Sequence, residues 1–256
     1  MSSIDLAALI PELATLINSR ISNIYQIDNS IFLIKFRQPK GTLLIEVGKR
    51  IHPTKYVLEV PEKPSPFCMA LRKYLRNGKI IGIRQLNFDR IIEIEIESRK
   101  EIYKLVCELF REGNIILVES EGNIIHALHY KKMRDRNIIR GEKYTKPPKH
   151  GLNLAKLEIE DLLKIKSFSN LEVVKGLAKF LGIGNPYVEE FLIRAGVNIH
   201  KPCEKLSEEE LVKIYNAIKE ITCSVLKGAE HPHLSLIHIS EPTRPRLISY
   251  AVFCLK

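Results

Sequence analysis

The sequence predicts an α+β fold, in which a β-sandwich with flanking helices precedes a small all-helical domain. Two observations support the sandwich: many short apolar runs bounded by turn residues lie between residues 21 and 130, and only two helical patterns accompany them. A third observation supports the helical domain, because apolar residues recur with helical spacing from residue 157 onward. We therefore expect a β-rich domain over residues 1–148 and a helical domain over residues 149–228.

The first expected element is an amphipathic helix from Ile4 to Asn18, with Ser2 or Ser3 as its N-cap. Pro11 lies inside this helix and is expected to kink it or to end a short first segment, because proline lacks the backbone N–H of a helix interior. Four strands are expected next, separated by turn-forming residues: Ile21–Ile27, Ile31–Arg37, Thr42–Val47 and His52–Leu58.

A second helix is expected from Phe67 to Arg76, after a proline-rich loop. Its basic residues Arg72, Lys73 and Arg76 either contact an RNA backbone or form a solvated helix face. Five more strands are expected to follow: Ile80–Leu86, Ile91–Glu97, Ile102–Phe110, Asn114–Glu119 and Ile124–Tyr130.

The strand expected over residues 91–97 alternates isoleucine with glutamate, which predicts a buried isoleucine face and an exposed glutamate face. Asp89 and Arg90 stand side by side where the chain enters this strand. An arginine there can bind phosphate as a planar fork, and the aspartate can orient that fork or accept from a ribose or base. The alternative is an ordinary turn aspartate beside an exposed arginine.

A basic segment, residues 131–149, is expected to link the two domains. Lysine and arginine dominate it, with only two acidic residues among them. If these side chains contact RNA phosphates, binding should weaken steeply with salt; the alternative is a solvated linker. The candidates for phosphate contact are Lys131, Lys132, Arg134 and Arg136.

The second domain contains a run, residues 181–191, that matches a helix-hairpin-helix. Gly182 and Gly184 flank one apolar residue, and a proline follows at the start of the next helix. The glycines let the backbone approach a phosphate, and the free N–H groups of a helix N-terminus bind anions. The alternative is a plain tight turn between helices. The helices expected in this domain are Leu157–Ile165, Leu171–Leu181, Tyr187–Ala195 and Glu208–Leu226, the last with a capping box from Ser207 to Glu210.

Bulk properties narrow the class of protein. The net charge of +10 favours a polyanionic partner or an acidic membrane surface. No apolar run approaches the ~18–20 residues of a membrane span, and the first residues lack a basic signal region, so we expect a cytoplasmic protein. The five cysteines are scattered singly, which predicts reduced thiols. No hydrolase, P-loop or metal-binding motif occurs, so we expect no catalytic residue, no metal and no cofactor.

The end of the chain differs in character from the rest. From about Leu234 the sequence shows no helical spacing, and Pro242 and Pro245 interrupt it. This stretch resembles translated sequencing adapter, so we expect residues 229–256 to be a foreign tail. The alternative is a genuine C-terminal edge strand.

Four segments, taken in order, resemble the N-terminal domain of the NFACT family, the RqcH/NEMF proteins of ribosome-associated quality control. The resemblance covers roughly residues 1–227 and suggests an archaeal source. It implies a sandwich like that of formamidopyrimidine-DNA glycosylases, followed by a helix-hairpin-helix domain. The segments are Ser22-Asn23-Ile24-Tyr25-Gln26-Ile27, Phe67–Leu75, Asn87–Glu97 and Gly113–Val118.

The resemblance also implies a function. In that family an aspartate near the N-terminus and an Asp-Arg pair act together on incoming transfer RNA; Asp5, Asp89 and Arg90 match these positions. The implied partners are the large ribosomal subunit through its rRNA, a stranded peptidyl-tRNA, and a charged aminoacyl-tRNA, alanyl in the prokaryotic versions. The nascent chain is thereby extended without a template. The factor needs no catalytic group, because the ribosome performs peptidyl transfer. Pro11 departs from the family's continuous first helix.

Two other functions are weighed against this one. A DNA-repair protein of the glycosylase type would share the fold, but those enzymes use an N-terminal Pro-Glu as nucleophile, and this chain begins Met1-Ser2-Ser3-Ile4. A surface adhesin is suggested only by the family's older name, fibronectin-binding protein, and the expected lack of a signal peptide argues against it.

Overall fold

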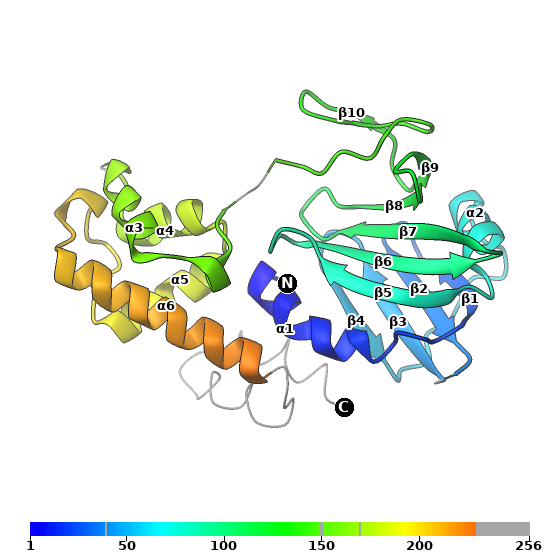
Figure 1. The fold of residues 1–256 in the computed structure, drawn as a ribbon, viewed down its shortest axis with the longest axis horizontal. Coiled ribbons are helices and arrows are strands. Elements are labelled where there is room, and N and C mark those ends of the chain that lie inside the picture. The colour runs from blue at the N-terminus through cyan, green and yellow to red at the C-terminus, as the bar shows by residue number, and fades with distance from the viewer. Residues whose placement is uncertain (39, 149–150, 169, 229–256) are drawn as a thin grey trace.

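The structure is a computed structural model that describes residues 1–38, 40–148, 151–168 and 170–228. The predicted foreign tail, residues 229–256, lies outside the described residues. Figure 1 shows two stacked sheets at one end of the molecule, a group of helices at the other, and helix α1 between them.

Helix α1 (Ser3–Ala14) begins with the predicted cap. The Ser2 hydroxyl accepts from the Asp5 N–H at 3.1 Å, and the Ser2 N–H donates to the Asp5 carboxylate at 2.7 Å, which forms a capping box. Pro11 does not end a short first segment, because α1 continues to Ala14. The helix tolerates the proline because the face on either side of it is buried in the sandwich core, through Leu9 and Leu13.

The first sheet is an antiparallel meander in which each strand pairs with the next. Its last strand ends four residues earlier than predicted. The strand lies at the edge of the sheet, so no strand among the described residues pairs with residues 55–60, and Val57 there is 94% exposed. The strands are β1 (Ile21–Gln26), β2 (Ile31–Phe36), β3 (Gly41–Glu46) and β4 (Arg50–Thr54).

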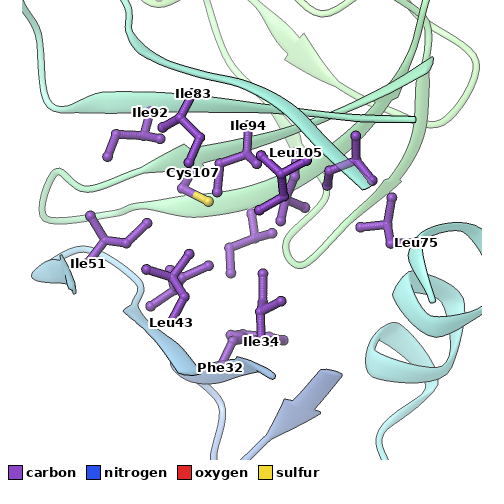
Figure 2. Close-up of a cluster of buried hydrophobic side chains, with 14 of the residues drawn as sticks. Phe32, Ile34, Leu43, Ile51, Leu75, Ile83, Ile92, Ile94, Leu105 and Cys107 are labelled. Atoms are coloured by element: carbon purple, nitrogen blue, oxygen red, sulfur yellow. The ribbon is translucent and has the colours of Figure 1, made fainter. Parts of the chain in front are cut away.

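The second sheet is also an antiparallel meander, and it packs face to face on the first. Figure 2 shows Phe32, Ile34, Leu43 and Ile51 of the first sheet across from Ile83, Ile92, Ile94, Leu105 and Cys107 of the second. The predicted β-sandwich is therefore present. Helix α2 (Pro66–Leu75) adds Leu75 to this core. The strands are β5 (Lys79–Gln85), β6 (Ile91–Ser98), β7 (Glu101–Glu108), β8 (Asn114–Glu119) and β9 (Ile124–Ala127).

Strand β6 departs from the predicted two-faced pattern at Glu93. Ile92, Ile94 and Ile96 are buried as expected, but Glu93 is buried as well. Its carboxylate accepts from Nε of Arg84 on the neighbouring strand at 2.8 Å, and this ion pair compensates for the loss of water.

The predicted linker over residues 131–149 is wrong in its first half. Strands β10 (Lys131–Lys132) and β11 (Asn137–Ile138) pair as a short antiparallel hairpin. Ile138 is buried in an apolar cluster with Val106 and Ile116, on the second sheet's outer face. The segment is therefore fastened to the sandwich through its own apolar anchor.

The helical domain has the predicted order of helices; the first two are shorter than predicted, whereas the last two are each two residues longer. Its core includes Ile4 of α1, whereas Leu6, two residues later, belongs to the sandwich core. Helix α1 is thus shared by both. Within the described part of the chain, no helix is long and apolar enough to cross a membrane. The α-helices are α3 (Ile159–Leu163), α4 (Val173–Leu181), α5 (Asn185–Ala195) and α6 (Glu208–Gly228), with short 3-10 turns at Leu154–Lys156, Lys164–Ser167 and Cys203–Lys205.

Candidate functional site

The turn between β5 and β6 has an unusual backbone. Asn87 and Phe88 both have positive φ, at 53° and 59°, and the Asp89 N–H donates to the Leu86 carbonyl at 2.9 Å. A bulky residue such as phenylalanine rarely adopts this left-handed conformation. It persists where the surroundings hold it, and here Phe88 packs against the core of the helical domain.

Asp89 and Arg90 follow directly in this turn, and both side chains are partly exposed. The Asp89 carboxylate accepts the backbone N–H of Arg90 at 2.7 Å. Among the residues that the structure describes, no hydrogen bond or ion pair reaches the Arg90 guanidinium. Its donors are therefore available for an anion, and the neighbouring carboxylate orders the backbone that carries it.

Gln85 connects this turn to the first turn of α1. Its side-chain amide donates to the carbonyl of Ser3 and to the carbonyl of Asp89, each at 2.9 Å. One amide group therefore fixes the distance between the start of α1 and the Asp89-Arg90 turn. The sequence analysis missed this residue, because nothing in its local pattern distinguishes it from other strand residues.

Asp5 lies at the same junction, but its carboxylate is already engaged. One oxygen accepts from the Ser2 N–H, and the other accepts from the hydroxyl of Tyr187 in the first turn of α5. Burial, and next the charge of Asp5, raise the pKa of the Tyr187 hydroxyl. The structure thus brings Asp5 near the Asp89-Arg90 turn through Ser3 and Gln85, and it adds Tyr187, which no sequence signal indicated.

The glycine turn between α4 and α5 has the local geometry that the sequence predicted. Gly182 ends α4 in the left-handed conformation, with φ of 67°, and Gly184 is the N-cap of α5. Pro186 occupies the first turn of α5. The arrangement leaves helix N–H groups next to an exposed glycine, while phosphate contact by this turn stays a prediction.

The three predicted basic residues of α2 differ in availability. Nε of Arg72 donates to the Ile24 carbonyl at 2.6 Å, and its guanidinium lies over the Tyr25 ring, 5.0 Å from the centroid. Lys73 and Arg76 are exposed. Arg72 therefore fastens α2 to β1, and the other two remain candidates for an RNA backbone.

The four basic residues predicted to contact RNA in the 131–136 segment also differ in how available their side chains are. Lys132 and Arg134 are exposed, and Lys131 lies 3.3 Å from the Glu112 carboxylate. Arg136 is buried, which contradicts its expected place on an RNA-binding surface. Both of its terminal nitrogens donate to Glu108, one of them at 2.9 Å, because that buried carboxylate requires a charged partner.

Tyr144 completes this buried group. Its hydroxyl donates to Glu108 at 3.0 Å. Burial, followed by the charge of Glu108, raises the pKa of Tyr144. We call Glu108, Arg136 and Tyr144 the hairpin clamp, because they join β7 to the hairpin and to the chain that follows it.

Comparison with known proteins places this chain in a family. The family model described as "NFACT N-terminal and middle domains" matches residues 2–248. That match reaches into residues 229–248, whose expected foreign origin stays a prediction. The archaeal Rqc2 homolog aRqcH of Methanocaldococcus jannaschii is 39% identical over 86% of this chain and 35% of its own length.

Two further similarities agree. The ribosome quality control complex subunit NEMF of Mus musculus is 32% identical over 83% of this chain and 21% of its own length. The N-terminal structure of the fibronectin/fibrinogen-binding protein from Streptococcus suis aligns with a TM-score of 0.67 at 27% identity, covering 84% of each chain. The chain therefore spans about a third of the length of the archaeal relative and about a fifth of the length of the mouse relative. On the strength of the family model and of these relatives, the chain belongs to the NFACT family, within its N-terminal and middle domains.

Proposed function

We propose that this chain is the RNA-binding part of a ribosome quality control factor. The factor binds a large ribosomal subunit that carries a stranded peptidyl-tRNA. It recruits a charged transfer RNA, alanyl-tRNA in the first instance, so that the nascent chain is extended without a template. The names of the relatives support ribosome quality control in general, and the Asp89-Arg90 turn supports the recruitment of transfer RNA.

The single observation that carries the proposal is the guanidinium of Arg90, which has no partner among the described residues and stands in a turn that is fixed from two sides. Gln85 holds the backbone of Asp89, and Phe88 packs on the helical domain. Because the backbone that carries Arg90 is already ordered, binding has to order only the side chain, and a planar guanidinium suits a two-point contact with phosphate. Lys132 and Arg134 supply further positive charge for an RNA backbone.

Asp5 has a positioning role in this proposal. Its carboxylate links the start of α1 to α5 through Tyr187, and α1 in turn carries the Ser3 carbonyl that receives Gln85. The aspartate therefore acts on the transfer RNA through the arrangement of the two domains. The factor works in the cytoplasm without a cofactor or metal, and the ribosome carries out peptidyl transfer.

The test is co-sedimentation of the full-length protein with large subunits that bear peptidyl-tRNA, followed by sequencing of the bound transfer RNA. The wild type is compared with Asp89→Ala/Arg90→Ala and with Arg111→Ala, an exposed arginine in the β7–β8 turn. We expect all three to bind subunits and only the double variant to lose transfer RNA.

Two results would count against the proposal. Full retention of transfer RNA by Asp89→Ala/Arg90→Ala would remove the turn from recruitment. Failure of the wild-type protein to bind large ribosomal subunits, together with binding to duplex DNA, would favour the glycosylase-related alternative.

A further inference from the structure

An aromatic and basic cluster lies at the end of the sandwich away from the helical domain. Figure 1 places α2 and β9 at that end. The cluster draws Lys73 and Tyr74 from α2, His126 from β9, Tyr130 from the segment after β9, and Arg140 from the segment after β11. Residues 141 and 142 hydrogen-bond to the backbone of Ile124, each at 2.8 Å, so this last segment runs beside β9.

The rings of the cluster form a graded series from buried to exposed. Tyr103 is buried and packs edge-on against Tyr74, with 5.5 Å between centroids. The Tyr74 ring lies 6.1 Å from that of His126, and Nδ1 of His126 lies 3.4 Å from the Tyr130 hydroxyl. Tyr130 is 51% exposed. The exposed tyrosine is thus tied through its hydroxyl to a histidine that itself packs on Tyr74.

Two cations border these rings. Lys73 holds its ammonium over the Tyr74 ring, 5.5 Å from the centroid, and both Lys73 and Arg140 are exposed. Burial, and then the positive charges of Arg140 and Lys73, lower the pKa of His126. Within the described residues neither cation forms an ion pair. The nearby carboxylate of Glu101 accepts from the Tyr103 hydroxyl, and Glu142 is the other acidic residue close in sequence.

We propose that Tyr130 and His126, supported by Tyr74, form a stacking platform for an unpaired nucleotide of single-stranded RNA. Lys73 and Arg140 hold the phosphates on either side of it. Aromatic faces stack on any base, and flanking cations track the backbone, so the site prefers unpaired RNA over a duplex. The apolar alternative, a ring cluster that is simply core, does not explain an exposed tyrosine beside a histidine that has two cations near it, neither of them in an ion pair within the described residues.

This site rests on the proposed function only in its choice of RNA as partner. It is separate from the Asp89-Arg90 turn, because that turn contacts the helical domain through Phe88, and the platform lies at the opposite end of the sandwich. The two surfaces can therefore be tested apart. A ribosomal partner would offer an unpaired nucleotide to the platform while transfer RNA occupies the turn.

The test uses the 256-residue chain and a labelled single-stranded oligoadenylate, with fluorescence anisotropy as the readout and a duplex RNA of equal length as competitor. Loss of one stacked base weakens binding by about tenfold or more, so we expect that effect for Tyr130→Ala. Tyr130→Phe keeps the ring and should bind like the wild type. Tyr56→Ala is the matched control, since Tyr56 is 53% exposed elsewhere on the sandwich.

The cations give a second, independent readout. Lys73→Gln and Arg140→Gln should each reduce the slope of log affinity against log salt by about 0.7, the value for one single-strand phosphate contact. Thermal unfolding followed by circular dichroism checks that each variant is folded.

Three outcomes would overturn the platform. They are unchanged oligoadenylate binding by Tyr130→Ala, an equal loss with Tyr56→Ala, and a wild-type protein that binds duplex as well as single strand. Asp89→Ala/Arg90→Ala should still bind oligoadenylate. If instead that variant loses oligoadenylate binding while Tyr130→Ala retains it, the platform is refuted and the proposed function at the turn stands.

Discussion

The sequence predicts contact with RNA for both Arg90 and Arg136, but the structure places the two side chains in opposite environments. Arg90 stands in a turn with a partly exposed side chain and no partner for its guanidinium among the described residues. Arg136 is buried with Glu108 in the hairpin clamp. Both arginines follow an aspartate in basic or turn-rich sequence, so the local pattern does not separate them.

The difference shows that the position of a buried carboxylate decides the role of an arginine. Glu108 is 1% exposed, and burying a carboxylate is costly unless a close partner such as the Arg136 guanidinium replaces water. The two residues are 28 positions apart in the sequence. In the part of the chain that the structure describes, no carboxylate forms an ion pair with the guanidinium of Arg90. One arginine therefore contributes to stability and the other remains available for binding.

The largest effect is expected for Glu108→Gln. Removing the charge leaves the Arg136 guanidinium buried and unpaired, which costs about 3–5 kcal/mol of unfolding free energy. Urea unfolding measures the change. Glu112→Gln is the control, because Glu112 forms only an exposed pair with Lys131 and its loss should cost under about 1 kcal/mol. Equal stability of the two variants would contradict the clamp.

Tyr187→Phe is expected to have a smaller effect. It removes a hydrogen bond to a charged group, Asp5, which contributes about 1.5–3 kcal/mol. Tyr215→Phe is the control in the same domain, since that partly buried ring contacts Lys219 but its hydroxyl has no hydrogen-bond partner in the described chain. A loss of stability as large in Tyr215→Phe would show that the Asp5 contact is not the cause.

The same tyrosines predict a dependence on alkaline pH. The pKa values of Tyr187 and Tyr144 are raised in the folded protein, first by burial and then by the nearby carboxylate. Their contribution is complete below the unfolded pKa of about 10 and is lost as pH rises toward the folded value, because only the unfolded state releases the proton. Unfolding free energy should therefore fall above about pH 10. The Tyr187→Phe/Tyr144→Phe variant should show a flatter profile, and an unchanged slope would refute the assignment.

The smallest effects are expected at the exposed cations of the hairpin. Lys132→Gln and Arg134→Gln should leave stability within about 0.5 kcal/mol of the wild type. Each should lower the salt slope for RNA binding by roughly 0.7–0.9 if it contacts one phosphate. Arg136→Gln provides the contrast, since it should destabilise the protein by removing the partner of Glu108. A salt slope unaffected by both exposed variants would exclude the hairpin from phosphate binding.

Much of the fold could be predicted because its signals are local. Alternating isoleucines defined β6, and the Ser207 to Glu210 capping box that starts α6 forms as expected, with the Ser207 N–H donating to Glu210 at 2.8 Å. The paired strands β10 and β11 were missed because each contributes only two residues, too few to show a period. Basic residues around them then gave the segment the composition of a linker.

The site was harder to predict because its contacts join distant parts of the chain. The Asp5 carboxylate and the Tyr187 hydroxyl are separated by 182 residues, and Gln85 reaches Ser3 across 82. The positive φ of Phe88 has no signature in composition, since glycine or asparagine is the usual residue there. The residues that carry charge were visible in the sequence, whereas those that position them were not.

Helix α1 has a consequence for the order in which the protein forms during synthesis. Ile4 packs in the helical core and Leu6 in the sandwich core, and α1 contacts α6, which is translated after both sheets. The side of α1 that faces the sandwich can pack as soon as the sheets form. The side that faces the helical domain keeps its apolar residues exposed until α6 has left the ribosome. A newly made chain therefore passes through a stage that is open to misassociation, and the arrival of α6 ends that stage.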